Sequence, residues 1–552
     1  MNSHKYKQIP LDGLAGLKQN FSADSMSGIM VFMLALPLSL GIAKASDFPA
    51  IYGLVTAIIG GVVVSFFSGS ALAIKGPAAG LIVIASGAVT AFGGNDKLLG
   101  WHLTLAAIVI AGLLQILFGI LKFGKFSDYF PGAAIHGMLA AIGIIIMSKQ
   151  IHNLLGIDPA LLNGKEPLQL IQMIPNSIIH ENPHLAEIGF ACLLVMIILS
   201  YIKNQHIKKI PPPMVVLAIS IPLGYVLHLK TDGMISNYAL VKVESILNVV
   251  SKNPINVNFS GLTSHPVAMI QYVILFALIG SIESLLTVKA MDSKDPYKRR
   301  SDTNKDLSAI GIGNVIAGIL GGLPMISEVA RSTSNVINGA KTRWANFFHG
   351  LFLLLALILA LPFINMIPNA ALAAMLIFVG FKLAHPKEFK HMWHIGKDQF
   401  LIFLTTIILT LAFDLLIGVL SGILLEILVN FYHGASIKGA FSTKLTRLII
   451  DGEKITLQLS PDTVFTNILG LKKCMDSIPM GLQLEIDFSK VNLVDHTSML
   501  TIYHFAEDYT EKGGHVKFVG KKYLVKTGDD KSSGRKYVNG NSVVNAGDIN
   551  LL

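Results

Sequence analysis

Fourteen apolar segments follow one another along most of the chain. A helix needs about 20 apolar residues to cross a bilayer, and backbone polar groups inside a membrane are satisfied only within helices or closed barrels. The pattern therefore predicts a polytopic α-helical membrane protein. We place the spans at roughly 24–45, 50–68, 76–92, 101–122, 129–149, 184–203 and 212–230, then 266–290, 306–322, 327–338, 346–366, 369–384, 398–413 and 415–433.

Composition supports a protein embedded in a lipid bilayer. Hydrophobic residues make up 52% of the 552 residues and charged residues only 14%, against about 25% charged in soluble domains. The net charge of +10 is spread over short loops, so we expect no nucleic-acid partner. Cys192 and Cys474 lie in apolar, helical surroundings and are interpreted as packing residues. The first apolar run starts near Ser25 and is too long for a cleavable signal.

Basic residues recur in every second loop. The groups are Lys122/Lys125, Lys203/Lys208/Lys209, Lys294/Lys298/Arg299/Arg300, Lys341/Arg343 and Lys382/Lys387/Lys390/Lys397. Because cytoplasmic loops carry an excess of Lys and Arg, this alternation predicts that both termini are cytoplasmic, with residues 1–23 as a basic lead on the cytoplasmic surface.

The spans form two sets of seven, in residues 24–230 and 266–433. Since seven is odd, successive sets have opposite orientations, which predicts an inverted repeat. The third span of each set is interrupted, by Lys75-Gly76-Pro77 in the first and by Gly321, Gly322 and Pro324 in the second. Paired broken segments at corresponding positions indicate two half-helices that face each other across a transport site.

The second break leads into a charged stretch, residues 324–343. Ser327 is the expected N-cap of the half-helix, with Glu328 in its first turn and Arg331 one turn further on. A helix start offers free N–H groups and partial positive charge, so we expect an anion to bind there. The candidate anion-binding residues lie at the two half-helix starts, with the backbone N–H groups of 76–80 and 327–331: Lys75, Gly76, Pro77, Ala78, Ala79, Ser327, Glu328, Ala330 and Arg331.

Lys75 and Glu328 each stand at the start of a half-helix, so we expect them to lie close enough to form an ion pair. Such a pair could simply hold the two repeats in register. Alternatively, it could act as a gate or specificity filter, with Lys75 neutralising a carboxylate that would otherwise repel sulfate.

From about Phe441 the pattern changes to that of a small α/β domain, residues 441–526. Residues 445–451, 454–459, 482–488 and 515–519 have the pattern of strands, with a tight turn at 452–453, and 464–478 and 497–512 that of helices. The Gly- and Asn-rich residues 527–552 are interpreted as a disordered tail.

Several motifs resemble those of the SulP family, the sulfate permease group of anion transporters. They are Ala35 to Ser39, Ile51 to Leu54, Gly76-Pro77, Gly280 to Thr287, and Ala330-Arg331-Ser332 with Asn335, Gly339 and Thr342. The resemblance implies fourteen helices in two inverted sets of seven, followed by a cytoplasmic STAS domain. Residues 486–489 and 495–498 resemble the segment that in related anti-sigma antagonists presents a phosphorylatable residue, here Thr497 or Ser498, although a Ser/Thr helix N-cap after Asp495 explains these residues better.

The resemblance also implies a function: secondary-active transport of an inorganic anion, bicarbonate first and sulfate second. Leu38 stands where sulfate-type members carry glutamine, which favours the bicarbonate branch, while Lys75 and Glu328 replace residues that are usually small or polar. Glu283, Thr287 and Ser327 are the candidates for binding a coupling Na⁺; Glu283 could instead carry H⁺, since Val329 stands where a hydroxyl ligand is expected.

The alternatives are an uncoupled channel or exchanger of the same family and a nucleobase transporter of the same fold. We also expect a homodimer, a cytoplasmic regulator bound to the STAS-like domain, and no cofactor beyond Na⁺. Phosphate-binding loops of the Walker type, nucleophile elbows and paired catalytic carboxylates do not occur in the sequence, so neither ATP-driven transport nor enzyme activity is expected.

Overall fold

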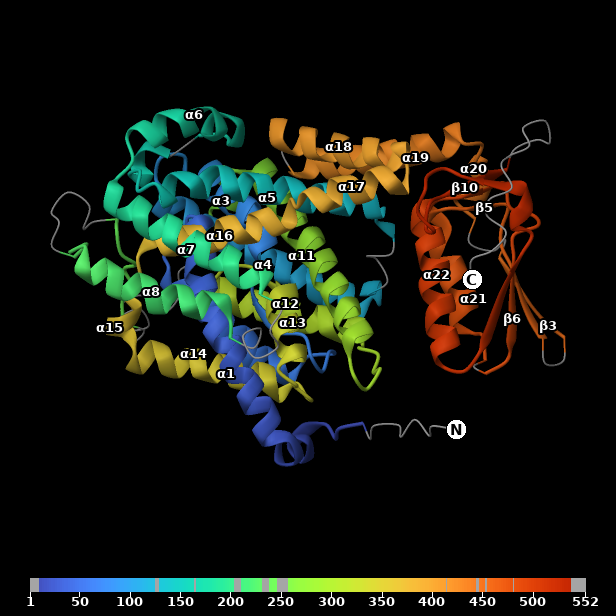
Figure 1. Cartoon of the computed structure of the whole chain (residues 1–552), viewed down its shortest axis with the longest axis horizontal. Coiled ribbons are helices and arrows are strands. Elements are labelled where there is room, and N and C mark those ends of the chain that lie inside the picture. The colour runs from blue at the N-terminus through green and yellow to red at the C-terminus, as the bar shows by residue number, and fades with distance from the viewer. Residues whose placement is uncertain are drawn as a thin grey trace. The chain divides into compact units, whose positions relative to one another are not determined.

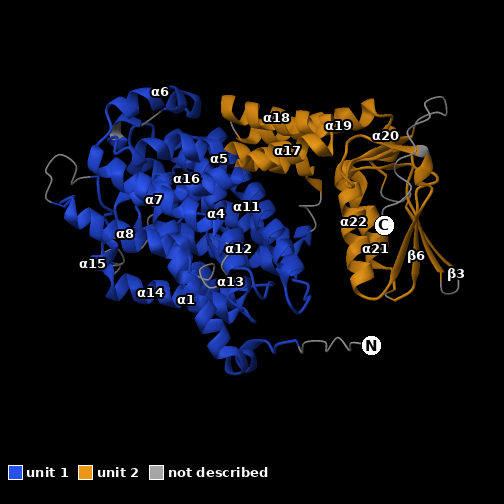
Figure 2. Ribbon diagram, viewed as in Figure 1, with its two compact units in different colours: residues 1–127, 142–383 blue, residues 128–141, 384–552 orange. Residues whose placement is uncertain are grey.

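The computed structural model of the chain describes residues 9–124, 129–162, 165–202, 210–230, 238–245, 257–413, 415–442, 446–451, 454–479 and 481–537. The chain divides into two compact units, residues 1–127 with 142–383 and residues 128–141 with 384–552 (Figure 1, Figure 2). The first unit is almost entirely helical, and the second joins helices to a C-terminal α/β region. The expected N-terminal lead lies within the described residues only from residue 9 onward.

Each predicted span coincides with a helix. The first set comprises α1 (Gly13–Ala45), α2 (Ile51–Ile58), α3 (Ile82–Gly93), α4 (Lys97–Ile120), α5 (Gly132–Leu154), α7 (Pro183–Tyr201) and α8 (Pro212–Val226). The second comprises α11 (Pro266–Lys294), α12 (Thr303–Ile319), α13 (Val329–Ile337), α14 (Trp344–Leu359), α16 (Asn369–Leu383), α18 (Lys397–Ala412) and α19 (Leu415–Tyr432). Seven helices in the described residues are long and apolar enough to cross a membrane, by length and composition. The polytopic, two-set fold class is confirmed.

The third helix of each set is short, as predicted. Helix α3 has 12 residues and α13 has 9, which at 1.5 Å per residue gives about 18 Å and 14 Å, well below the roughly 30 Å of a bilayer core. Each is preceded by a three-residue strand, β1 (Lys75–Pro77) or β2 (Met325–Ser327), and the two strands pair with each other. Each half-helix therefore starts inside the protein, beside the strand crossing.

Glycines permit close crossings between the helices that surround the paired strands. An added Cβ on Gly112 of α4 would lie 2.8 Å from the Gly311 carbonyl oxygen of α12, and one on Gly311 would lie 2.6 Å from the Gly112 carbonyl oxygen. Gly61 and Gly350 leave as little room between the segment after α2 and α14. Small residues at such contacts let helix backbones approach closely within a membrane.

Helices also form in stretches that we expected to be loops, among them α6 (Pro167–Ile179) and α17 (Pro386–Ile395). Helix α6 follows α5 and packs against it through His152 of α5. His152 Nδ1 lies 2.7 Å from the Ser177 hydroxyl of α6, and His152 Nε2 lies 3.0 Å from the Leu170 carbonyl oxygen of α6. Helix α17 precedes α18. Helices α6 and α17 both begin with a proline, which suits a first helical position because its missing N–H would have no partner there.

The C-terminal region contains the predicted strands and helices. Strands β3 (Arg447–Asp451), β4 (Lys454–Gln458), β6 (Gln483–Asp487) and β8 (His515–Val519) form a sheet in which β3 is antiparallel to β4, while β4, β6 and β8 are parallel. Helices α21 (Ile468–Asp476) and α22 (His496–Glu511) supply the core against this sheet. The predicted turn at 452–453 lies outside the described residues.

The prediction that residues 527–552 form a disordered tail is wrong for their first part. Residues 528–534 lead back to β10 (Arg535–Tyr537), which pairs with β9 (Leu524–Lys526) and with β7 (Leu493–Val494). Strand β5 (Asp462–Thr463) completes this second sheet. Strand β9 lies a short loop before β10 and β7 lies further upstream, and the Gly- and Asn-rich composition of the segment revealed neither pairing. Residues 538–552 lie outside the described residues.

The α4–α12 crossing yields a first prediction. Gly311→Val should lower the melting temperature of the detergent-solubilised protein, because a side chain at this contact must displace backbone, and overpacking costs about 1–3 kcal/mol. Leu113→Val, at a half-exposed position on α4, is the control and should have little effect. Equal melting temperatures for Gly311→Val and wild type would contradict the close crossing.

Candidate functional site

The candidate site is built on the crossing of the two broken segments. Strands β1 and β2 run antiparallel, with Lys75 opposite Ser327, Gly76 opposite Ile326 and Pro77 opposite Met325. The pairing continues at both ends, because the Ala78 N–H donates to the Pro324 carbonyl and the Glu328 N–H donates to the Ile74 carbonyl, at 3.4 and 2.9 Å. Backbone that is not helical thus finds partners deep in the protein, as a membrane interior requires.

Three asparagines hold the extended segments in place. Asn314 of α12 accepts from the Met325 N–H at 2.6 Å and donates to the Met325 carbonyl. Asn335 of α13 donates to the Leu72 carbonyl, and Asn346 of α14 accepts from the Lys75 N–H. Sequence reasoning named only Asn335, as part of a family motif. Polar amides inside apolar spans are the signal that would have found the other two.

Arg331 lies at the crossing, as predicted. Its side chain is fully buried, and Nη2 donates to the Ser39 hydroxyl of α1 at 3.2 Å. A Cβ on Gly76 would lie 2.3 Å from Arg331 Nη1, so the guanidinium packs directly against the backbone of β1 at this glycine. Within the described residues, Nε and Nη1 of Arg331 have no hydrogen-bond partner. The site therefore contains a buried cation with unused donors, which is the property an anion requires.

Glu328, and not Ser327, is the N-cap of α13. The Glu328 carboxylate accepts from the Arg331 N–H at 2.8 Å and the Ala330 N–H at 3.4 Å, and it lies 3.6 Å from Arg331 Nε. Ser327 belongs to β2, and its N–H donates to the Ser284 hydroxyl. The prediction that Ser327 caps the helix is wrong, because β2 continues through this residue to the crossing.

Several predicted anion donors are consequently engaged within the protein. The backbone N–H groups of Ala78, Ser327, Glu328, Ala330 and Arg331 all donate to other groups of the chain, and Pro77 has no N–H. Ala79 and Gly80 belong to the single turn η3 (Ala79–Leu81) that leads into α3. The Arg331 side chain is therefore the strongest anion-binding group that the structure offers.

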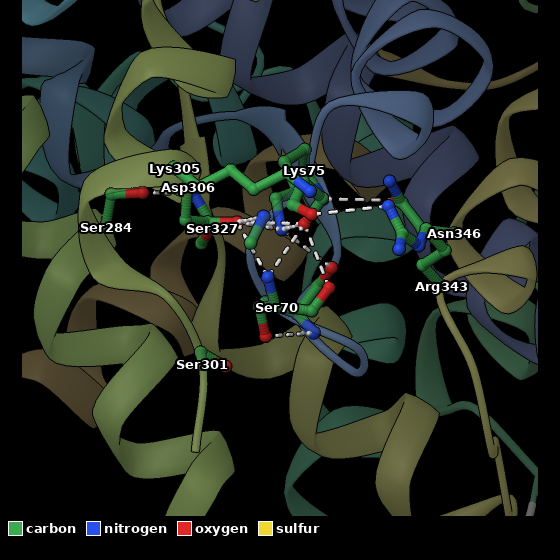
Figure 3. Close-up of polar contacts among 12 residues, drawn as sticks. Ser70, Lys75, Ser284, Ser301, Lys305, Asp306, Ser327, Arg343 and Asn346 are labelled. Atoms are coloured by element: carbon green, nitrogen blue, oxygen red, sulfur yellow. Dashed lines mark hydrogen bonds and ion pairs between the residues drawn. The ribbon is translucent and has the colours of Figure 1, made fainter. Parts of the chain in front are cut away.

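Lys75 pairs with Asp306 of α12 and not with Glu328 (Figure 3). Lys75 Nζ lies 2.9 Å from Asp306 Oδ1 and donates to the Ser68 hydroxyl at 2.7 Å and the Ala73 carbonyl at 3.3 Å. The three ammonium protons are thus used, and both side chains are buried. The predicted Lys75–Glu328 pair is wrong.

Asp306 was not recognised as a site residue in the sequence. It accepts from Ser68 and from the N–H groups of Gly69 and Ser70 on Oδ1, and from the Ser327 hydroxyl at 3.2 Å on Oδ2. An acidic residue in the first turn of a helix is commonly explained by its favourable interaction with the helix dipole. The sequence therefore did not single out Asp306 as a site residue. Asp306 joins α12 to both strands of the crossing.

Glu283 and Thr287 of α11 lie on one helix face, as their spacing predicted. Both are buried, and within the described residues Glu283 Oε1 and Thr287 Oγ1 have no hydrogen-bond partner. A Cβ on Gly80 would lie 2.0 Å from Glu283 Oε1, so the carboxylate packs against the backbone leading into α3. Two unpartnered oxygens suit a hard cation or a proton on the carboxylate. The Ser327 hydroxyl, the third predicted ligand, already donates to Asp306.

The predicted phosphorylation candidates lie in the C-terminal region. Asp495 is the N-cap of α22 and accepts from the Ser498 N–H at 2.8 Å, so neither Thr497 nor Ser498 is the cap. Burial raises the pKa of Asp495 to about 6. Ser498 is fully buried, while the Thr497 hydroxyl accepts from the Gly132 N–H at 3.3 Å. A kinase would reach Thr497 more readily than Ser498.

Comparisons with known proteins agree with this arrangement. The model of the sulfate permease family matches residues 21–406. Curated relatives include a putative sulfate transporter of Bacillus subtilis, which is 29% identical over 74% of this chain and 73% of that protein. A bicarbonate transporter of Synechocystis is 25% identical over 91% of this chain and 88% of that protein. The solved transmembrane domain of a cyanobacterial bicarbonate transporter is similar over 73% of this chain and 98% of that chain, with a TM-score of 0.63 and 24% identity.

The fold and the half-helix site define a membrane anion transporter, not an enzyme. The chain belongs to the sulfate permease family. Another solved relative, SLC26A9, is similar over 91% of this chain and 85% of that chain, with a TM-score of 0.64. Since the identity there is 14%, this likeness supports the fold alone.

The Lys75–Asp306 pair generates a second prediction. Lys75→Met should lower the thermal stability of the purified protein strongly, because it leaves Asp306 charged and buried, a loss of about 3–5 kcal/mol. The double variant Lys75→Met with Asp306→Asn should recover part of this loss, since no buried charge remains. Thermal unfolding in detergent measures both, and a Lys75→Met protein as stable as wild type would show that the pair is unimportant.

Proposed function

We propose that the protein transports an inorganic anion across the cell's inner or plasma membrane by a secondary-active mechanism, with bicarbonate as the first substrate and sulfate as the second. The observation that carries the proposal is Arg331, a buried guanidinium with two nitrogens lacking hydrogen-bond partners among the described residues, at the crossing of two broken helices. The relatives support both anions, since their names describe sulfate and bicarbonate transporters. Leu38, in place of the glutamine of sulfate-type members, favours bicarbonate.

The charges at the crossing explain why transport would be coupled to a cation. Lys75 and Asp306 compensate each other, and Arg331 is offset by the nearby Glu328. Glu283 then decides the balance: ionised, it gives the empty site a net negative charge that disfavours an anion. Binding of H⁺ or Na⁺ at Glu283 removes that charge, so the anion and the cation favour each other's binding.

Coupling to a cation also lowers the electrical cost of anion uptake. An anion that enters a cell with a negative interior works against about 2.3 kcal/mol per charge per 100 mV. A cation moving with a monovalent anion cancels this electrical cost. An uncoupled exchanger or channel of the same family is the alternative, and it would show no response to Na⁺ or pH gradients. A nucleobase transporter is less compatible with the buried charge of Arg331.

The remaining features of the proposal concern the whole assembly. We place both termini in the cytoplasm, on the basis of the alternating basic loops. The C-terminal region would act as a STAS-like domain that binds a cytoplasmic regulator, and the protein would work as a homodimer. Na⁺ or H⁺ is the coupling ion, and we propose no other cofactor. Chemical crosslinking in native membranes would test the dimer.

A third prediction concerns Arg331. Arg331→Gln should raise the half-saturating concentration of the anion at least about 30-fold, since removing a charged partner from a buried site costs about 2 kcal/mol or more. Flux of radiolabelled bicarbonate and sulfate into proteoliposomes measures this. Arg447→Gln, which removes an exposed charge from β3, is the matched control. Normal transport by Arg331→Gln would refute the proposed site.

A fourth prediction separates the two coupling ions. Glu283→Gln should abolish accumulation driven by a Na⁺ or H⁺ gradient while retaining anion exchange, because the site is then permanently uncharged. Thr287→Val should weaken coupling to Na⁺ but leave coupling to H⁺ intact, since a proton on Glu283 needs no second ligand. Thr287→Ser keeps the hydroxyl and is the control. Gradient-driven accumulation by Glu283→Gln would place the coupling site elsewhere.

A further inference from the structure

The Glu328 carboxylate occupies the N-terminus of α13. It accepts hydrogen bonds from the Arg331 and Ala330 N–H groups and lies 3.6 Å from Arg331 Nε. A helix N-terminus together with a buried arginine forms a set of donors suited to a bound oxyanion. In this protein the anion that faces these donors is the Glu328 carboxylate.

Among the described residues, no lysine forms an ion pair with this carboxylate. The Lys75 ammonium, on the neighbouring strand, uses its three protons on Asp306, Ser68 and Ala73. Among the described residues, Glu328 forms an ion pair with Arg331 of α13, and its carboxylate and that of Glu283 on α11 repel each other. Glu328 is therefore held by Arg331 and the helix start, and repelled by Glu283.

The Glu328 side chain lies near the surface of its unit. It is 15% exposed, whereas Arg331 is fully buried. The next residue, Val329, is 52% exposed, so the start of α13 opens to the surface of its unit. The hydrogen bond from Arg331 to Ser39 does not involve Glu328, and Nε and Nη1 of Arg331 have no hydrogen-bond partner among the described residues. An arriving anion could then bind to the same N–H groups.

We infer that Glu328 is a tethered occupant of the anion site, which a transported anion must displace before it binds. The inference rests on the proposed function. In the empty state, Glu328 satisfies the α13 N–H groups and offsets the charge of Arg331, so the site is stable without a ligand. In the occupied state, the displaced carboxylate remains nearby and repels the substrate.

This arrangement has a consequence for selectivity. Coulomb repulsion from the displaced carboxylate is proportional to the charge of the bound anion. Sulfate, with two charges, is therefore penalised about twice as much in free energy as bicarbonate, with one. Glu328 thus lowers the affinity for every anion and favours monovalent over divalent substrates.

The test compares Glu328→Ser and Glu328→Gln with wild type in proteoliposomes. Serine keeps a helix N-cap, because its hydroxyl accepts the same kind of backbone N–H, but it removes the charge and frees the site. We expect the half-saturating concentration of bicarbonate to fall about tenfold, the size of one charge-assisted hydrogen bond, and that of sulfate to fall further. Glutamine, nearly isosteric, should change both in the same direction.

A rescue experiment tests occupancy directly. Glu328→Gly leaves space for a small carboxylate and costs the helix start little, since glycine is tolerated at an N-cap. Added acetate should compete with bicarbonate uptake by Glu328→Gly more strongly than by wild type or by Glu328→Ser. Acetate inhibition that is equal in all three proteins would overturn the inference.

The outcomes separate the two proposals. Unchanged or raised half-saturating concentrations in Glu328→Ser and Glu328→Gln, together with lost transport in Arg331→Gln, would leave the anion site standing and refute the tethered occupant. Equal falls for bicarbonate and sulfate would refute the effect on selectivity. Normal transport by Arg331→Gln would instead refute the site itself. Melting temperatures of all variants show whether each protein is folded.

Discussion

The structure depends on one constraint: two stretches of extended backbone cross inside a protein that lies in a membrane, where water cannot satisfy their polar groups. Pairing β1 with β2 satisfies some of them. Side chains satisfy others, above all Asn314 and Asn346, which bond to the strands from outside the pair. The helices around the crossing form a scaffold for it. Both half-helices can start inside the protein because these partners are present.

Asp306 both accepts hydrogen bonds from the backbone near the crossing and balances the charge of Lys75. A lysine buried at the crossing would be unfavourable without an anionic partner, and Asp306 supplies the charge while also binding the 68–70 loop and Ser327. Since Lys75 is compensated locally, it adds little field at the half-helix starts. The charges left to act on a substrate are those of Arg331, Glu328 and Glu283, so with both carboxylates ionised the site carries one net negative charge, which one bound cation neutralises.

The spans, the two broken helices and the position of Arg331 could be predicted from the sequence, because apolar length, Gly-Pro breaks and an isolated charge are local signals. The partner of Lys75 could not. Residues opposite each other in a strand pair point to the same face, and successive residues point to opposite faces. Lys75 is opposite Ser327, and both side chains reach Asp306. Glu328 is one residue further along, so its side chain is directed away, toward α13.

That single-residue offset also explains why an acidic residue is tolerated beside Arg331. Had Glu328 shared the face of Lys75, two carboxylates would compete for one ammonium, and the N–H groups of Ala330 and Arg331 would lack their cap. With the observed register, each carboxylate has its own donors: Asp306 has Lys75, and Glu328 has the start of α13. The register that secures the crossing therefore also places a removable negative charge where a substrate anion would bind.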